Sequence, residues 1–384
     1  MTTTATTSPT RPARDQLLAH LADLVACDTR NPPRDPAPIA RLFSLVGDAL
    51  GPDFSVELRD LGDGCRWLSA RRGGDGRSRK EIPLVNVHID TVPKDAGWTR
   101  DPFQLDLTTI DGELCAVGLG ACDIKGAVAA FLVAAARTNG PIDLLLTSDE
   151  EAGSSRCVQT FVAEHDVVGR MVLVAEPTQG RAVVAHRGIG TAVITFNGVA
   201  GHASHKRAAV DSAVAEAVRF GAAALELAAA DDQAIRLNLG RIEGGTKANM
   251  IASSCVLRFG VRPPPELAAD AVLARLQGLL TPGRATFERG FLAPALPAPW
   301  GERDIATARA TSRARANALG LLPGDDVDFF TEAAFFSAAG ADAVVFGPGD
   351  IAQAHTPDEW VRVVELEAVA AAYAAVMGGP ASAS

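Results

Sequence analysis

The 384-residue chain is 47% hydrophobic and 21% charged. This composition is typical of a soluble globular protein and excludes long disorder, collagen or coiled coil as the main architecture. Acidic residues (46) outnumber basic residues (36), and the net charge of −10 argues against nucleic acid or an anionic membrane as the main partner. At about 150 residues per domain, the length predicts two or three domains. The longest strongly apolar run, 127–136, is too short to cross a bilayer.

Two further features of the composition bear on the compartment. Residues 1–13 are rich in threonine and lack a basic segment followed by an apolar one, so we expect a disordered tail on a cytoplasmic protein. The six cysteines are scattered and form no Cys-x-x-Cys pair. We therefore expect reduced, mostly buried thiols rather than a disulfide framework or a zinc ribbon.

The first half of the chain alternates predicted helices with predicted strands. Apolar periodicity and chain-breaking residues predict helices at 15–26, 37–50, 124–138 and 155–164. Strands are predicted at 55–60, 66–71, 82–89, 142–147 and 171–175. The run 82–89 is apolar throughout its body, as expected of a strand in a sheet that is covered on both faces. This alternation predicts an α/β fold with a mixed, mostly parallel sheet.

The pattern changes between 182 and 293. Strands are predicted there at 182–187, 191–197, 234–242 and 256–261, with helices at 210–229 and 265–280. A split β-α-β arrangement of this size predicts an inserted α+β domain. The α/β pattern then resumes with a helix at 303–319, a strand at 343–346 and a helix at 363–376. The predicted layout is a discontinuous main domain, 14–181 and 294–384, interrupted by 182–293.

Candidate chemical groups follow several of the predicted strands. Residues two apart in a strand face the same side, so Asp90 can accept a hydrogen bond from the His88 nitrogen that does not bind a metal. Taken alone, the pair also fits a strand-end histidine beside an unrelated turn aspartate. Asp123 lies at a loop-to-helix junction, where aspartate usually caps the helix. Gly118 and Gly120 precede it, but no third glycine follows at the spacing of a dinucleotide-binding motif.

Acidic groups also follow the next predicted strands. Asp149-Glu150-Glu151 comes after 142–147, Glu176 follows 171–175, and His355 follows 343–346. Ligands of open α/β sheets bind at the carboxyl ends of the strands, although a solvated acidic turn is the alternative for the triplet. Histidines and carboxylates without paired cysteines match the nitrogen and oxygen ligands of a hydrolytic zinc site. A two-metal site requires a shared carboxylate, with the metals about 3.5–4 Å apart.

These motifs resemble those of the co-catalytic dizinc aminoacylase and carboxypeptidase family, over nearly the whole chain after the tail. The resemblance is carried by Asn86-Val-His-Ile-Asp90-Thr-Val-Pro, Gly118-Leu-Gly-Ala-Cys-Asp-Ile-Lys-Gly126, Ser148-Asp-Glu-Glu151, Ala175-Glu-Pro-Thr178, Gly201-His-Ala-Ser204 and the terminal His355. Within the family, 331–333 and 347–359 most resemble acetylornithine deacetylases and their bacterial variant that acts on acetylcitrulline. Cys122-Asp-Ile-Lys125 and Asp328-Phe-Phe-Thr-Glu332 lean toward that variant.

The resemblance implies five ligands for one or two zinc or cobalt ions: His88, Asp123, Glu151, Glu176 and His355. Asp123 would bridge, since it would share one ion with His88 and Glu176 and the other with Glu151 and His355. A bound metal lowers the pKa of its water to near ~7.

Two neighbouring acids would complete the reaction site. By the resemblance, Asp90 would orient His88 and Glu150 would be the general base. Glu150 would take a proton from the water that attacks the acetyl carbonyl and pass it to the leaving amine.

The inserted domain carries its own candidates by resemblance. His202 would stabilise the tetrahedral oxyanion, either within its own subunit or, as often in the family, in the site of a neighbouring subunit. Asn249 and Arg262 would grip the substrate's α-carboxylate, which suits the forked donors of arginine, with Lys247 a weaker candidate. A surface-loop histidine and ordinary strand-end polarity are the alternatives. His186 and His205 are further weak candidates, and Cys122 is either a thiol beside the metal or simply a buried side chain.

The implied function is hydrolysis of the N-acetyl amide of an ornithine-like amino acid, acetylornithine or acetylcitrulline, with release of acetate, in arginine biosynthesis. A succinyl-diaminopimelate desuccinylase, a glutamate-type carboxypeptidase or a dipeptidase would use the same metal site. The intact ligand set with Glu150 argues against a non-catalytic binding protein, and the lack of a Gly-x-Ser-x-Gly motif argues against a serine hydrolase. The implied partners are a small N-acylated amino acid and, by analogy, a second copy bound through the inserted lid or dimerisation domain. Nucleic acid and membrane are not expected.

Overall fold

The computed structural model describes residues 11–73, 76–151, 153–230 and 235–378, and these residues form two compact units. The first unit extends as far as Val184 and includes Pro299–Asp326 and the chain from Thr331 onward. The second comprises Ala185–Ala298 and Val327–Phe330. The boundaries thus fall at 185 and 298 rather than at 182 and 293, and a short late segment joins the second unit.

The beginning of the described chain is a helix. Helix α1 (Arg11–Val25) starts at Arg11 rather than at 15, so the expected tail, 1–13, is too long at its inner end. Residues 1–10 of that tail lie outside the described part of the chain. Helix α2 (Pro36–Leu50) starts where the Asp35 side chain accepts a hydrogen bond from the Ala37 amide, and its proline falls in the first turn, where no amide is needed.

The first unit is built on a six-stranded sheet in the order β1-β2-β6-β3-β7-β14. Its strands are β1 (Ser55–Asp60), β2 (Arg66–Arg72), β3 (Leu84–His88), β6 (Ile142–Thr147), β7 (Met171–Val174) and β14 (Asp342–Val345). Strands β6, β3, β7 and β14 run parallel, while β2 pairs antiparallel with both β1 and β6. The predicted mixed, mostly parallel sheet is confirmed.

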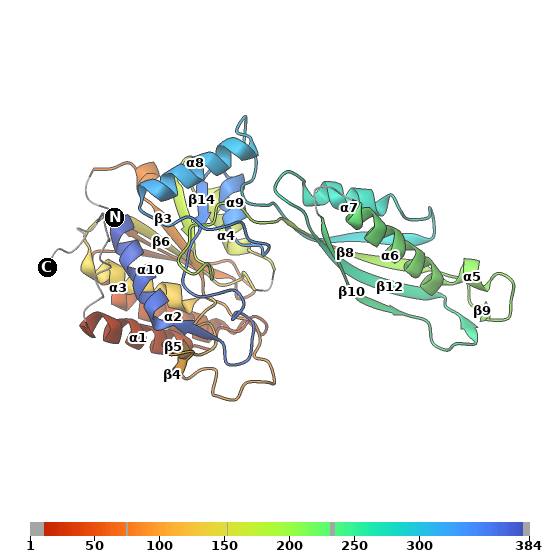
Figure 1. Ribbon diagram of the computed structural model, residues 1–384, viewed down its shortest axis with the longest axis horizontal. Helices are drawn as coiled ribbons and strands as arrows, with labels where there is room; N and C mark the ends of the chain where they lie inside the picture. The colour runs from red at the N-terminus through yellow and green to blue at the C-terminus, as the bar shows by residue number, and fades with distance from the viewer. Residues whose placement is uncertain (1–10, 74–75, 152, 231–234, 379–384) are drawn as a thin grey trace. The chain divides into compact units, whose positions relative to one another are not determined.

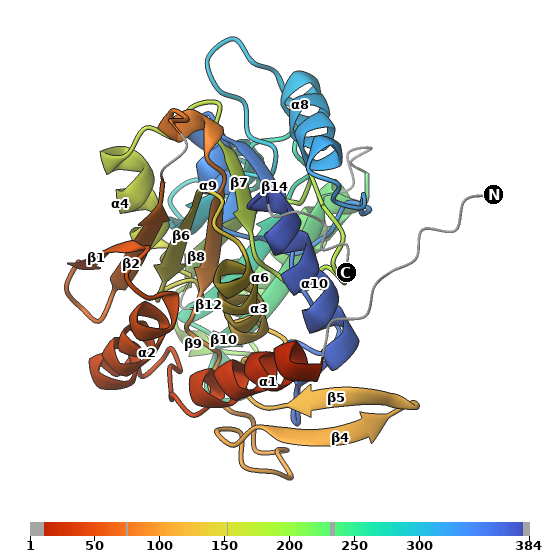
Figure 2. The ribbon, with the colours of Figure 1, turned by 90° about the vertical axis from the view of Figure 1, so that its left-hand side faces the viewer.

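Helices cover both faces of this sheet. On one face, α1, α3 (Lys125–Arg137) and α10 (Val363–Val376) lie side by side, as Figure 2 shows. On the other face lie α4 (Arg156–Glu164) and α9 (Ala333–Ala338), and α8 (Ile305–Ala318) contacts β14 (Figure 1). Val85 and Val87 of β3 belong to the core beneath α3. His88, one residue further along the strand, therefore points to the opposite side.

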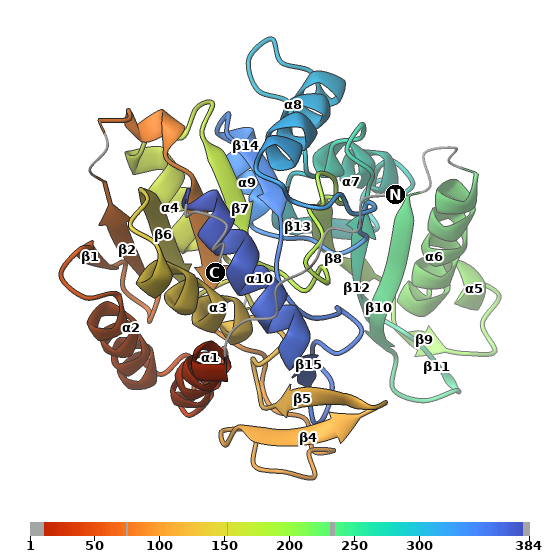
Figure 3. The same ribbon diagram turned by 60° about the vertical axis from the view of Figure 1, so that its left-hand side comes forward.

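A smaller three-stranded antiparallel sheet also belongs to the first unit. It consists of β4 (Asp106–Ile110), β5 (Glu113–Val117) and β15 (Trp360–Arg362), in the order β15-β5-β4. Strand β15 joins the hairpin through the pair Trp360 and Val117 (Figure 3). None of these three strands was predicted, nor was α9.

The second unit is an antiparallel four-stranded sheet with two helices. The sheet has the order β10-β12-β8-β13, formed by β8 (Ile189–Asn197), β10 (Arg236–Gly244), β12 (Ser254–Arg262) and β13 (Ala285–Ala293). Helices α6 (Ala213–Ala229) and α7 (Ala269–Gln277) pack against it around one apolar core. A short ribbon, β9 (Gly201–His202) with β11 (Met250–Ile251), and the single turn α5 (Ala208–Asp211) complete the unit.

One predicted strand is wrong. Residues 182–187 form only isolated bridges, among them Val183 with Val345 and His186 with Leu296. The apolar run is buried because it carries the chain out of the first unit into the second, not because it lies in a sheet. Strand β13 was not predicted. Within the described residues, no helix combines the length and the apolarity needed to cross a bilayer.

Candidate metal centre

The five predicted ligands come from five separate segments of the first unit. They lie at the end of β3, before α3, after β6, after β7 and after β14: His88, Asp123, Glu151, Glu176 and His355. Because β3, β6, β7 and β14 are parallel, their carboxyl ends meet at one edge of the sheet, where open α/β sheets bind ligands. The fold therefore brings together residues that are up to 267 positions apart (355 − 88).

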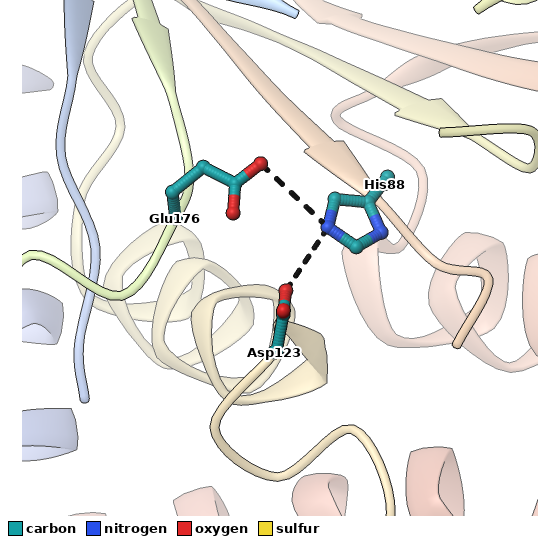
Figure 4. A group of neighbouring side chains, drawn as sticks. All are labelled: His88, Asp123 and Glu176. Carbon is teal, nitrogen blue, oxygen red and sulfur yellow. Dashed lines mark hydrogen bonds and ion pairs between the residues drawn. The ribbon is translucent and has the colours of Figure 1, made fainter. Parts of the chain in front are cut away.

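The first cluster comprises His88, Asp123 and Glu176, all of them buried. His88 Nε2 lies 3.1 Å from Asp123 Oδ1 and 3.8 Å from Glu176 Oε1. Figure 4 shows both carboxylates directed at this one ring nitrogen. Ligand atoms around a tetrahedral zinc ion, at about 2.0–2.1 Å from the metal, lie roughly 3.3–3.4 Å from one another. The observed separations fit a shared cation.

The second cluster comprises Asp123, Glu151 and His355. His355 Nε2 lies 3.1 Å from Glu151 Oε1 and 3.4 Å from Asp123 Oδ2. The two oxygens of the Asp123 carboxylate therefore face two different histidines, as a carboxylate that bridges two cations must. The His355 side chain is 53% exposed, whereas that of His88 is 3% exposed, so solvent reaches the centre from the His355 side.

The electrostatics of the centre favour a bound cation. Burial, reinforced by neighbouring negative charges, raises the pKa values of Glu176 and Glu150 well above their usual range. Hydrogen bonds to Asp123 and Glu151 raise the pKa of His355 to about 11. Burial opposes the ionisation of Asp123, but hydrogen bonds to the two histidines hold its pKa below the usual value. Crowded acids that bind protons this strongly match a site whose negative charge is neutralised by divalent cations.

Asp90 acts on the centre in two ways. Its backbone carbonyl lies 3.1 Å from His88 Nδ1, within hydrogen-bond distance, while its carboxylate is 3.6 Å away. Both the carbonyl and the carboxylate of Asp90 thus lie beside the nitrogen of His88 that does not face Asp123. The carboxylate also accepts the backbone amides of Glu150 and Glu151 at 3.2 and 3.0 Å. A donor that the sequence did not single out, the Asn31 side-chain amide, completes its hydrogen bonds at 2.8 Å.

Asp149 holds the same acidic turn from its other side. Its buried carboxylate accepts the Ser154 hydroxyl at 2.9 Å and the amides of Arg156 and Cys157 at the start of α4. It is therefore a helix cap for α4 rather than a member of the metal centre. The Glu150-Glu151 turn is fixed between Asp90 and Asp149, which holds both glutamates at the sheet edge.

The loop after β14 passes close beneath the first cluster. A Cβ atom at Gly347 would lie 2.7 Å from the Glu176 carbonyl oxygen, so only glycine permits this approach. Further along, His355 has a backbone φ of 61°, a left-handed conformation that costs about 1–2 kcal/mol for a residue with a Cβ. The surrounding contacts hold this unfavourable conformation, and it turns the ring toward Glu151 and Asp123.

Two more buried acids lie near the centre. Glu332, at the start of α9, accepts the Thr147 hydroxyl at 2.9 Å. Glu359 accepts three backbone amides from the loop that carries Asp123. Both residues lie within sequence stretches that carried the family resemblance, but nothing local in those stretches indicated what their side chains bind.

The candidates of the second unit fall into two groups. His202 and Asn249 belong together, because Met250 pairs with His202 and the Ala203 amide donates to the Asn249 carbonyl at 3.1 Å. Lys247 lies nearby in the same exposed turn. Arg262 is at the far end of β12, whose nine residues span roughly 26 Å at ~3.3 Å per residue. The second unit of one chain therefore does not bring Arg262 to His202.

The ring of His202 has a defined tautomer. The Ser204 amide donates to Nδ1 at 3.3 Å, and the Ser204 hydroxyl lies 2.8 Å from the same nitrogen. Nδ1 is thus an acceptor, so the proton of a neutral ring sits on Nε2. Because the side chain is exposed, Nε2–H is available to donate a hydrogen bond to a ligand.

Three weaker candidates have ordinary surroundings. His186 is buried, with Nδ1 2.8 Å from the Arg187 carbonyl and its ring against Phe330. His205 lies on the exposed turn beside His202. The Cys122 thiol is buried and donates to the Asp350 carbonyl at 3.4 Å.

The fold is that of a known class of enzymes. The sequence model of peptidase family M20/M25/M40 matches residues 84–378. The chain therefore belongs to this family of metal-dependent hydrolases. The resemblance on which the hydrolase prediction rested is thereby confirmed.

Individual relatives of known name are similar to this chain over nearly its whole length. The chain is 45% identical over 360 residues to an N-acetyl-L-citrulline deacetylase of Xanthomonas campestris pv. campestris, covering 91% of this chain and 94% of the relative. It is 34% identical to an acetylornithine deacetylase of Myxococcus xanthus, covering 94% and 95%. Among solved structures, aminopeptidase PepT of Bacillus cereus has the same fold, with a TM-score of 0.70, 19% identity and coverage of 95% and 98%.

Proposed function

We propose that this protein hydrolyses the N-acetyl amide of acetylcitrulline or acetylornithine, using one or two zinc or cobalt ions. The observation that carries the proposal is the Asp123 carboxylate, whose two oxygens face His88 and His355 at 3.1 and 3.4 Å. Identity of 45% over nearly the full length of an N-acetyl-L-citrulline deacetylase supports the substrate class. The reaction would release acetate and a free amino acid, a step of arginine biosynthesis in the cytoplasm.

The cation would be held by the two clusters that share Asp123. When bound, a divalent cation polarises the scissile carbonyl and lowers the pKa of a coordinated water to near ~7. Glu150 is the general base: its turn is fixed by Asp90, and it directly precedes the ligand Glu151 at the same sheet edge. Glu150 passes that proton to the nitrogen of the leaving amine.

Groups of the second unit are proposed to bind the rest of the substrate. The Nε2–H of His202 is a donor for the oxyanion of the tetrahedral intermediate. Arg262, with Arg236 and Arg258, lines a cavity of about 580 Å³, and its forked donors suit the α-carboxylate. Asn249 and Lys247 lie on the side of the unit that carries His202, so they would act together with it.

A homodimer through the second unit is the proposed assembly. Strand β10 is an edge strand and carries the exposed Ile242. Helix α6, which packs against β10, carries Val218 and Leu225, which are 60% and 50% exposed. An unpaired strand edge beside exposed apolar side chains is a typical pairing surface. A second copy would bring a second His202 into the assembly.

Substrate turnover with defined metals tests the proposal. The protein is stripped with a chelator, and acetate release from acetylcitrulline, acetylornithine and succinyl-diaminopimelate is measured with and without added Zn²⁺ or Co²⁺. We expect metal-dependent deacetylation, fastest with one of the two acetylated substrates. Preferential hydrolysis of the succinylated substrate would point to a desuccinylase, and turnover that is independent of metal would reject the mechanism.

A further inference from the structure

The Glu359 carboxylate is buried at a point where three backbone amides converge. The side chain is 1% exposed. Its Oε1 accepts the amides of Cys122 and Asp123 at 2.8 and 2.9 Å, and its Oε2 accepts the amide of Gly120 at 3.2 Å. One carboxylate thus binds the amides of three of the four residues 120–123. One of these residues is Asp123, whose side chain is shared by both metal clusters.

The backbone of Glu359 continues the same connection. Its carbonyl accepts the Gly118 amide at 3.0 Å, and the next residue, Trp360, begins β15 and pairs with Val117 of β5. A row of hydrogen bonds therefore runs from the β5–β15 ladder through Glu359 to Asp123, and Figure 3 shows the two strands of that ladder side by side. The two segments are far apart in sequence, and this row fixes how one is aligned against the other.

This alignment affects the two clusters unequally. His355 lies four positions before Glu359 (359 − 355), on the same C-terminal segment. The segment held by the carboxylate carries Asp123. In the cluster of Asp123, Glu151 and His355, two of the three ligands thus belong to the segments that Glu359 joins. In the cluster of His88, Asp123 and Glu176, only Asp123 does.

We propose that Glu359 is a positioning residue that sets the spacing of Asp123 and His355, and thereby the affinity of the second cluster for its cation. The inference rests on the proposed metal binding, but not on the identity of the substrate. Outer groups that orient metal ligands typically contribute 10–100-fold to metal affinity. A neutral amide of the same size would keep one acceptor oxygen but would point its own N–H groups at a backbone N–H.

The neighbouring acid provides a matched control. Asp358 also accepts backbone amides, those of Thr99 at 3.0 Å and Arg100 at 3.3 Å. Its partners carry no ligand of either cluster, and the residue is half-buried. Asp358→Asn therefore removes a carboxylate that binds backbone amides next to Glu359 without touching the loop of Asp123.

The test is a Zn²⁺ titration by calorimetry of the chelator-stripped full chain, with circular dichroism and thermal unfolding of the metal-free samples. We expect two binding events in the wild type. In Glu359→Gln, one event should weaken by about 10–100-fold while the other changes much less, and Asp358→Asn should match the wild type. Deacetylase activity of Glu359→Gln should recover as Zn²⁺ is raised, whereas a simple loss of folded protein would not respond in this way.

Each outcome bears on a different claim. A wild type that binds no Zn²⁺ overturns the proposed function and this inference with it. Equal Zn²⁺ affinities of the wild type and Glu359→Gln overturn the inference alone, even if the variant unfolds at a lower temperature. If Glu359→Gln does not fold, hydrogen exchange of the metal-free wild type decides. The amides of Gly120, Cys122 and Asp123 should exchange slowly, and rapid exchange overturns the inference.

Discussion

The side-chain amide of Asn31 donates a hydrogen bond to Asp90 Oδ2 at 2.8 Å, and both side chains are buried. Asp90 in turn holds the Glu150-Glu151 turn by two backbone amides. The loop after α1 is thereby connected to the proposed general base, although no residue before 84 belongs to the region matched by the family model.

Replacing Asn31 with alanine should weaken the centre without removing any ligand. Asp90 would lose the side-chain donor that binds its Oδ2, and a hydrogen bond to a charged group contributes about 1.5–3 kcal/mol. We expect Asn31→Ala to lower the free energy of unfolding by that amount and to reduce kcat about 10–100-fold, because the Glu150 turn is less well fixed. Asn317→Ala, on the exposed last turn of α8, should change neither. An unaltered kcat in Asn31→Ala would reject this connection.

Glu150→Gln should separate metal binding from proton transfer. The amide keeps the volume of the side chain but cannot accept a proton, and general bases typically contribute about 10²–10⁴-fold to turnover. We expect kcat to fall by this factor while the zinc content, measured by elemental analysis, stays at the wild-type level. In Glu151→Gln, by contrast, the primary effect should be a loss of bound zinc. Substantial turnover in Glu150→Gln would exclude the assigned role.

The stability of the metal-free protein should depend on pH through Glu332. Burial raises the pKa of this acid to about 8, whereas in an unfolded chain it ionises at about 4.3. Between these values the folded state retains a proton that the unfolded state has lost. The free energy of unfolding should therefore fall as the pH rises through this window, by up to roughly 1.4 kcal/mol per pH unit.

Denaturant unfolding at pH 5, 6, 7 and 8 checks this dependence. Glu332→Gln cannot ionise, so its stability relative to the wild type should increase steadily from pH 5 to pH 8. Glu164→Gln, whose side chain is 40% exposed, should leave the pH profile unchanged. Parallel profiles for the wild type and Glu332→Gln would count against the raised pKa.

A buried ion pair at the start of β6 should contribute strongly to the stability of the first unit. Asp143 accepts hydrogen bonds from Arg170 at 2.6 Å and from Arg79 at 2.9 Å, and the Arg170 side chain is 2% exposed. Asp143→Ala leaves this guanidinium buried without its counter-ion, which costs about 3–5 kcal/mol. Breaking the exposed Arg59–Glu164 pair by Glu164→Gln should cost less than about 1 kcal/mol. Unfolding in guanidinium chloride measures both losses of stability. Equal losses in Asp143→Ala and Glu164→Gln would show that burial of the ion pair is not the cause.

Mixing two inactive variants tests where His202 acts. If His202 serves the partner's site, a hybrid dimer of Glu150→Gln and His202→Ala regains one intact site. Random exchange of subunits in a symmetric dimer should then restore about a quarter of wild-type activity. If His202 serves its own subunit, both sites of every hybrid remain defective and the mixture stays inactive. Val218→Glu in both chains, which places a charge on the exposed face of α6, should prevent recovery by blocking exchange into dimers.

The sequence predicts the elements that bring the metal centre together because each element has a local signal. The buried strands β3, β6 and β7 are marked by apolar runs, and the acids and histidines that follow them must meet at one sheet edge. The hairpin of β4 and β5 also had a local signal that was overlooked. Asp111-Gly112 has positive φ at both residues, 52° and 84°, as required by the tight turn that Asp-Gly favours.

The contacts that hold the ligands in place leave no such local signal. Asn31 and Asp90 are 59 positions apart, and Glu359 and Asp123 are 236 apart. The alignment of β15 with β5 determines which backbone amides the buried Glu359 carboxylate binds. The periodicity of the sequence does not predict that alignment. The run 182–187 reads as a strand for a related reason, because burial of a connecting segment and burial within a sheet produce the same apolar composition.

The interruption of the first unit also constrains how a newly made chain matures. The second unit, apart from 327–330, is one continuous stretch ending at Ala298, so most of it can collapse while the ribosome is still translating the rest. The parallel strand β14 is synthesised after that stretch and joins a sheet whose other strands are already made. His355 is synthesised later still. A nascent chain therefore has an incomplete set of metal ligands until His355 is made. We expect the cation to bind late in the synthesis of the protein.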